Sequence, residues 1–173
     1  MTSFITRRLL IRPWRADDRE ELHRWTGDVT MMRYITDGRP WDTEEVDELM
    51  KRQQRHLDAH DVCFGAVQRL DDARLVGLAG MQPLDTGDFE LGWWIWKDHW
   101  GRGYAPEAIA PFIEHARNTM GLQRLVAVID PPNSASIRVA EKIGMRFERN
   151  MSARDTIAKR PDKVISLYAM SLR

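Results

Sequence analysis

Trp100-Gly101-Arg102-Gly103-Tyr104-Ala105 is the stretch of this sequence that decides the fold. It lies between an aromatic-rich segment that is typical of a strand, 88–97, and a segment with the apolar spacing of a helix, 104–120. Glycines at such a turn let the backbone approach an anion, and the unpaired amides of the helix's first turn point toward it. The alternative is a tight turn in which the glycines only permit positive φ. The stretch is neither a Walker loop nor a dinucleotide fingerprint, because it lacks the Gly-Lys-Ser/Thr and the third glycine of those motifs.

The residues before this turn alternate between strand and helix patterns. Acidic residues open a helix over 17–25, and Thr43 is expected to cap a helix that runs to about residue 57. Short turn-like connections between the later strands predict an antiparallel meander. The strands expected in this part are 8–12, 62–68, 75–82 and 88–97.

The residues after the turn predict a crossover back to the sheet. The helix 104–120 stops at Gly121, and the apolar run 125–129 is typical of a strand buried on both faces. A helix between two strands favours a right-handed parallel crossover, so 88–97 and 125–129 should lie parallel. Asn133 should cap a helix over 134–143, and strands 145–150 and 163–172 should close the sheet as a hairpin.

These elements predict one domain over residues 1–173 with an α/β fold of the α+β type. Its mixed, mostly antiparallel sheet should have about seven strands, flanked by about four helices. Neither repeats nor linker-like stretches indicate a second domain.

Composition narrows the class of protein. The 26 lysines and arginines balance 26 aspartates and glutamates, so nothing in the overall charge favours a nucleic-acid or membrane-surface partner. The single cysteine, Cys63, cannot form an intrachain disulfide, and no Cys/His spacing is typical of a zinc site. We therefore expect no bound metal. We also expect a cytoplasmic protein, since no apolar run reaches the length of a signal peptide or a membrane span.

Three ordered motifs carry a resemblance to a known family. They are the segment 90–108, the opening segment 6–14 and the segment Asn133 to Met145, with the closing strand around 167–170 as a fourth match. Together they resemble the GNAT acetyltransferases, in particular the branch of the ribosomal-protein serine and alanine N-acetyltransferases. Trp100 departs from the glutamine or arginine that usually begins the family's pyrophosphate loop.

The resemblance implies that acetyl-CoA is the cosubstrate and that its pyrophosphate lies on the loop. It also implies that the central parallel strands splay apart to hold CoA and free the backbone amides of residues 94–96. Arg102 would add positive charge beside the phosphates, or be a solvated surface arginine. The cofactor-binding residues that the resemblance implies are Trp94, Ile95, Trp96, Gly101, Arg102, Gly103, Tyr104, Ala105, Asn133 and Ser136.

Acetyl transfer to nitrogen needs an amine that has lost its proton. Glu90, whose spacing from Gly103 resembles that of the family's base, is the candidate, and an apolar aromatic surround would favour its role. The alternative is a strand residue that pairs with an arginine. Ala140 stands where many relatives have a tyrosine acid, which leaves Ser136 to orient the cofactor and to protonate the leaving thiolate. Asn133 and Ser136 could instead serve only the start of their helix.

The implied reaction moves an acetyl group to a primary amine, either a protein N-terminus or a small molecule. A non-catalytic acyl-CoA-binding module and a transferase of another acyl group remain alternatives, and the sequence leaves a homodimer open. Five aromatic residues are candidates for the acceptor cleft: Trp25, Tyr34, Trp41, Trp94 and Trp96.

Overall fold

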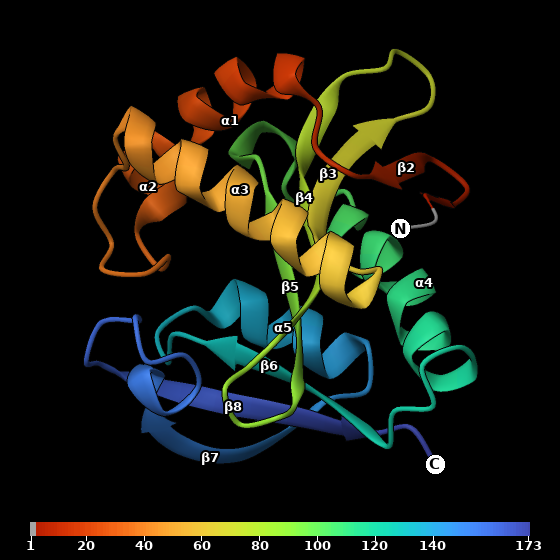
Figure 1. The fold of residues 1–173 in the computed structure, drawn as a ribbon, viewed down its shortest axis with the longest axis vertical. Coiled ribbons are helices and arrows are strands. Elements are labelled where there is room, and N and C mark those ends of the chain that lie inside the picture. Colours follow the sequence, from red (N-terminus) through yellow and green to blue (C-terminus); the bar gives the residue numbers. More distant parts are fainter. Residues whose placement is uncertain (1–2) are drawn as a thin grey trace.

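A computed structural model describes residues 3–173 as an open eight-stranded sheet with five α-helices (Figure 1). The strand order is β1-β2-β3-β4-β5-β6-β8-β7, and β5 and β6 are the one parallel pair in it. The strands are β1 (Phe4–Ile5), β2 (Leu9–Arg12), β3 (Phe64–Arg69), β4 (Leu75–Pro83), β5 (Phe89–Ile95), β6 (Arg124–Ile129), β7 (Arg146–Ser152) and β8 (Val164–Ser171). The helices are α1 (Arg19–Thr26), α2 (Val29–Met32), α3 (Thr43–His60), α4 (Tyr104–Asn118) and α5 (Ser134–Lys142).

The predicted class, a mixed and mostly antiparallel sheet with a central parallel pair, is confirmed. The meander β3-β4-β5 and the closing pair of β7 with β8 are also as predicted. Two short elements, β1 and α2, account for the difference from about seven strands and four helices. They have two and four residues, too few to produce a visible hydrophobic period.

The start of α3 differs from the prediction by one residue. Asp42, not Thr43, is the N-cap, and its carboxylate accepts a hydrogen bond from the amide of Glu45 at 2.9 Å. The Glu45 carboxylate accepts in turn from the amide of Asp42 at 3.0 Å, which completes a capping box. With the cap at Asp42, Glu45 is the acidic residue at the third helical position that a capping box requires.

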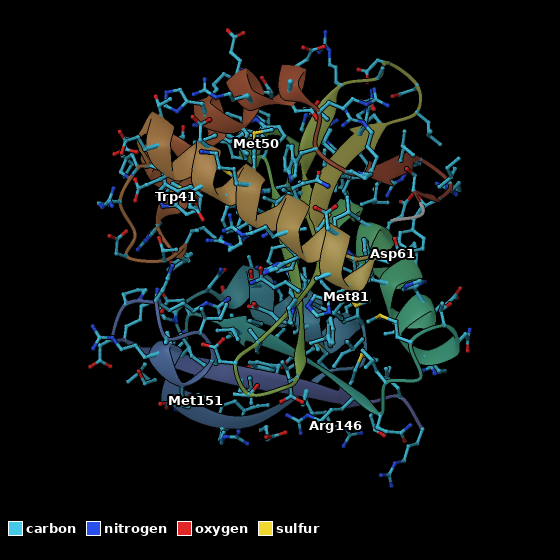
Figure 2. All side chains as sticks on the ribbon, viewed as in Figure 1. Trp41, Met50, Asp61, Met81, Arg146 and Met151 are labelled. Carbon is cyan, nitrogen blue, oxygen red and sulfur yellow. The ribbon has the colours of Figure 1, made fainter. Side chains whose placement is uncertain are left out.

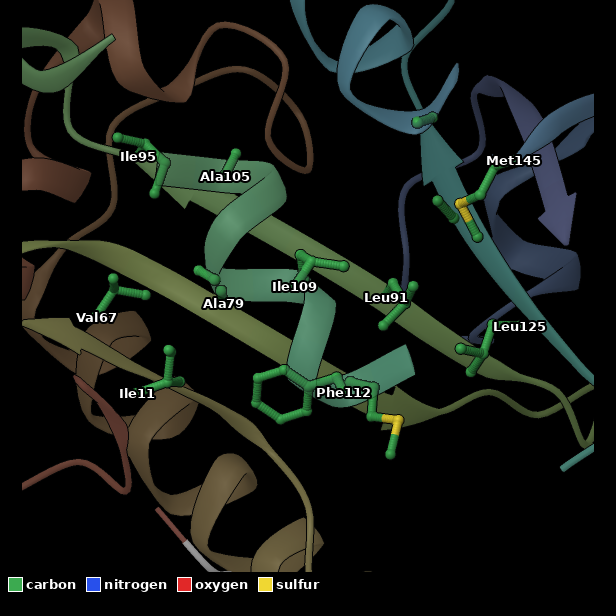
Figure 3. Packing of buried hydrophobic residues seen from close by; sticks show 14 of the residues in the cluster. Ile11, Val67, Ala79, Leu91, Ile95, Ala105, Ile109, Phe112, Leu125 and Met145 are labelled. Carbon is green, nitrogen blue, oxygen red and sulfur yellow. The ribbon is translucent and has the colours of Figure 1, made fainter. Parts of the chain in front are cut away.

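Helices cover the two faces of the sheet asymmetrically. The inner face of α4 carries Ile109 and Phe112, which lie over β4 and β5 in the core that Figure 3 shows. The same core continues to Leu125 and Met145 in the second half of the molecule. Helices α1 to α3 pack on the opposite face of β3 to β5 through a second cluster, which includes Leu49.

A buried ion pair ties β2 to the first helical turns. The guanidinium of Arg12 donates to both carboxylate oxygens of Asp18, at 2.7 and 2.9 Å, and both residues are buried. Burial raises the pKa of Asp18, but the hydrogen bonds and charge of Arg12 outweigh it and leave that pKa below its ordinary value. This pair fixes where α1 begins, on the face of the sheet that α3 also covers.

None of the helices described in residues 3–173 is long and apolar enough to cross a membrane.

Candidate active site

The parallel strands β5 and β6 diverge immediately after they meet. Their ladder holds a single pair, Glu90 with Val126, and beyond it β5 continues beside β4 only. The amide of Trp96 was predicted to be free, but it donates to the carbonyl of Val76 at 2.8 Å. Because alternate residues of a strand pair with opposite neighbours, the amides of Trp93 and Ile95 are the ones that point into the splay. Of the three amides expected to be free, the register keeps that of Ile95, adds that of Trp93, and directs those of Trp94 and Trp96 toward β4.

The glycine turn has the backbone conformation that only glycine adopts readily. Gly101 and Gly103 have φ of 74° and 76°, in the left-handed region. A Cβ atom at Gly101 would meet nothing within 4 Å, and one at Gly103 would meet only the Arg8 side chain at 3.7 Å, so the turn is open outward. Gly103 is the N-cap of α4 and no side chain caps that end. The first-turn amides of α4, among them those of Tyr104 and Ala105, therefore face this opening without a side-chain acceptor, which fits a pyrophosphate group.

Neighbouring side chains hold the turn in place. The indole of Trp100 donates to the carbonyl of Ile95 at 2.6 Å, which joins the turn to the end of β5. The guanidinium of Arg8 donates to the carbonyl of Arg102 at 3.0 Å and to the carboxylate of Glu107 at 2.7 Å. Burial raises the pKa of Glu107, but hydrogen bonds from Arg8 and Thr6 outweigh this effect and leave the pKa below its ordinary value. Sequence reasoning missed this support, because its parts lie about a hundred residues apart.

A cavity of about 550 Å³ extends from the splay to the helical half of the molecule. It brings together Glu90, Trp94, Asn133 and Ser136, all of which the sequence predicted for the site. Of the aromatic candidates for the acceptor cleft, Tyr34, Trp41 and Trp94 line it. Figure 2 places Trp41 in the helical half, and Met151 of β7 in the other half.

The structure separates the other two aromatic candidates from this cavity. Trp25 is buried and stacks on Trp96, with ring centroids 6.2 Å apart. Trp96 instead lines a second cavity of about 790 Å³, together with Arg102 and His99. Trp25 and Trp96, two of the five candidates for the acceptor cleft, are therefore not among the residues that line this cavity.

Glu90 is buried in a polar surround, not in the apolar one that was predicted. Arg160 donates to its Oε2 at 2.6 Å and Gln82 donates to the same oxygen at 2.9 Å. Gln53 of α3 donates to Gln82 at 3.2 Å and accepts from the amide of Phe64 at 2.7 Å. Neither Arg160 nor Gln82 bonds the second carboxylate oxygen of Glu90, Oε1. The alternative of an arginine partner is thus observed, but at a buried position inside the cavity.

The start of α5 brings two polar side chains to the splay. The Asn133 side-chain oxygen accepts from the amide of Ser136 at 3.2 Å, so Asn133 is a true N-cap. Both residues line the cavity. Ala140 is fully buried and has no polar group to offer. In the part of the chain that the structure describes, no cluster of three histidine, cysteine or acidic residues could hold a metal ion.

Comparison with known proteins identifies the family. Residues 8–146 match the model of the acetyltransferase (GNAT) domain. The chain belongs to the GNAT acetyltransferase family. This match confirms the resemblance that the motifs carry. Acetyl transfer is the chemistry of this family.

Individual proteins resemble the chain over most of its length. The uncharacterized N-acetyltransferase YnaD of Bacillus subtilis is 31% identical over 143 residues, which are 83% of this chain and 82% of that protein. Mycobacterium smegmatis RimJ, solved with CoA-disulfide, superposes with a TM-score of 0.78 at 18% identity and covers 98% of this chain and 86% of its own. The spermidine N-acetyltransferase of Vibrio cholerae, solved with CoA and spermine, superposes with a TM-score of 0.73 at 16% identity. The superposition covers 95% of each chain.

Proposed function

We propose that this protein transfers the acetyl group of acetyl-CoA to the nitrogen of a primary amine by direct attack in a ternary complex. The observation that carries the proposal is the cavity in which the splayed strands and Glu90 meet. Because one cavity holds both the expected thioester position and a carboxylate, the two substrates can react without an acyl-enzyme intermediate. A cytoplasmic location, with its pool of acetyl-CoA, belongs to this proposal.

The chain's own groups divide the cofactor between them. The first-turn amides of α4 and the charge of Arg102 would hold the pyrophosphate, since amides at a helix N-terminus favour an anion. The amides of Trp93 and Ile95 would donate to the pantetheine and to the thioester oxygen, where negative charge develops. The side-chain amide of Asn133 would contact the cofactor arm. When bound, acetyl-CoA supplies an acyl group on a thiol leaving group.

Glu90 would receive the proton that the amine loses. In the reaction a carbon–nitrogen bond forms, the carbon–sulfur bond breaks, and one proton leaves the nitrogen while the sulfur gains one. Oε2 of Glu90 is occupied by Arg160 and Gln82, so Oε1 is the atom that can accept the proton. Ser136 lines the same cavity and would orient the thiol end of the cofactor and donate to the departing sulfur. A thiol of pKa about 8.5 leaves without strong acid help.

The rival hypothesis is a module that binds acyl-CoA and does not react. Ala140, in place of the tyrosine that many relatives carry, favours it, whereas the oriented carboxylate of Glu90 favours an enzyme. The two hypotheses separate in one experiment: release of free CoA from acetyl-CoA, measured with and without a panel of primary amines. Amine-dependent release supports the enzyme. Thermal stabilisation by CoA with no release for any amine supports the module.

A conservative substitution tests the role of Glu90. Glu90→Gln keeps the hydrogen-bonding shape but removes the basic oxygen, so the amine-dependent rate should fall by about 10²- to 10⁴-fold, the usual contribution of a general base. CoA affinity, measured by calorimetry, should stay within about twofold because the loop and the splay are unchanged. Wild-type turnover in this variant would contradict the assignment of the base.

A further inference from the structure

The charges that line the 550 Å³ cavity are unequally partnered. Five carboxylates line it, and each forms an ion pair with an arginine or a lysine. These pairs are Asp37 with Arg39, Glu45 with Arg39, Glu48 with Arg55, Glu90 with Arg160, and Asp130 with Lys163. Two lining cations, Arg52 and Lys159, take part in none of them. The five lining cations and the five lining carboxylates balance, but among the described residues the two cations without an ion-pair partner are open to an anion.

Arg52 is the better candidate for binding an anion because it is partly buried, whereas Lys159 is exposed. It lies on α3 next to Gln53, whose side chain reaches Gln82 and so belongs to the network that holds Glu90. Burial lowers the pKa of Arg52, the positive charge of Arg160 lowers it further, and Glu48 and Glu90 act in the opposite direction. A guanidinium that is partly withdrawn from water, near a second guanidinium, is destabilised until an anion binds it.

We infer that Arg52 binds an anionic group of the acceptor, so that the substrate is a primary amine that also carries a carboxylate or a phosphate. The inference rests on the proposed function and names its substrate class. The planar fork of a guanidinium suits both groups, since each offers two oxygens in the right geometry. With the anion held at Arg52, the amine of the same molecule can reach Oε1 of Glu90.

The same charge pattern disfavours polyamines. A second ammonium group would need a carboxylate to receive it, but the carboxylates of this cavity are already paired. It would also meet Arg52 and Lys159, and like charges in a partly desolvated site repel. The spermidine N-acetyltransferase resembles this chain in fold at 16% identity, and the resemblance of fold does not carry its substrate over.

The experiment compares acceptors that differ only in the anionic group. Three matched pairs serve: L-amino acids and their C-terminal amides, the dipeptide amides Asp-Ala-NH₂ and Asn-Ala-NH₂, and O-phosphoethanolamine and ethanolamine. Spermidine is added as a polycationic acceptor. The measurements are kcat/KM from CoA release, and binding of each compound to the CoA-saturated protein by calorimetry. The three pairs distinguish a free α-carboxylate, an acidic N-terminal residue and a phosphate.

Variants of α3 identify the binding group. Arg52→Gln should lower kcat/KM for the favoured anionic acceptor by about 10- to 100-fold, the effect of losing hydrogen bonds to a charged partner. Its effect on the neutral member of the same pair should be less than about twofold, and Arg52→Lys should restore part of the loss. Lys51→Gln is the matched control, because it removes one positive charge from the adjacent, exposed position of the same helix.

The outcomes separate this inference from the proposed function. A preference for the anionic member of a pair that disappears in Arg52→Gln but persists in Lys51→Gln supports it. Equal use of both members, or preference for spermidine, overturns the inference and leaves the acetyltransferase proposal standing. If no amine is acetylated, the proposed function fails, and calorimetry then decides on Arg52: selective binding of the anionic members supports its role, and equal binding refutes it.

Discussion

Replacing Gly103 by valine should separate cofactor binding from folding. The residue has φ of 76°, and a side chain in the left-handed region costs about 1–2 kcal/mol of folding free energy, with β-branched residues at the upper end. The protein itself leaves room for a Cβ atom, which would meet only the Arg8 side chain at 3.7 Å, an ordinary van der Waals distance. The branched side chain would, however, occupy the opening toward which the first-turn amides of α4 point.

Loss of one amide hydrogen bond to a charged phosphate costs about 1.5–3 kcal/mol, so the Kd for CoA should rise by about 10- to 100-fold. Calorimetric titration of CoA measures this, and thermal unfolding measures the stability. Gly121→Val is the matched control: its φ is 64°, and nothing lies within 4 Å of its Cβ position, but it is at the far end of α4. Both variants should be similarly destabilised. Wild-type CoA affinity in Gly103→Val, or equal loss of affinity in both, would refute the assignment of the loop.

Two further predictions concern stability. Asp18→Asn leaves the buried guanidinium of Arg12 without its charge partner and should destabilise the fold by about 3–5 kcal/mol in urea unfolding; a change below about 1 kcal/mol would show that water reaches this pair. Burial, followed by the charge of Arg52, lowers the pKa of His56 from 6.5 to about 4. The folded state therefore binds fewer protons than the unfolded state, and stability should fall as the pH drops from 6.5 to 4. The loss should be about 1–2 kcal/mol after screening of the partly exposed ring, and the pH dependence should be weaker in His56→Gln.

Local patterns were sufficient for the elements that form the cofactor side of the site. The apolar spacing of 104–120 and the run 125–129 correspond to α4 and β6. Because a helix connects β5 to β6, the sequence favoured a parallel crossover between these two strands. The glycine turn needed no tertiary information, because its φ angles and its place before α4 follow from the residues themselves. What local patterns could not give was the register of β5 against β4. That register decides which amides are free: it retains Ile95 from the predicted residues 94–96, and it directs the amides of Trp94 and Trp96 toward β4 while that of Trp93 faces the splay.

The acceptor side was harder to predict because its groups come from segments that interact only after folding. Arg160 lies in the connection between β7 and β8, where no period marks a residue, yet it is the partner of Glu90. Arg52 and Gln53 did leave a signal. The buried positions Val46 and Leu49 set a stripe along α3 that should continue with apolar residues at 52 or 53. Polar residues there indicated a site, since burial of such groups requires partners.

The ion pair of Glu90 gives its two oxygens different tasks. A carboxylate that faced only apolar residues could turn freely and would have no fixed direction for an amine. Here Arg160 and Gln82 bind Oε2, and Gln82 is fixed through Gln53 to α3, so the position of Oε1 is set by the packing of helix on sheet. Arg52 is carried by the same helix, adjacent to Gln53. The distance between the anion of an acceptor and the oxygen that takes its proton is therefore set by one rigid element, and such a site should select acceptors by the spacing of their charged groups as well as by their charge.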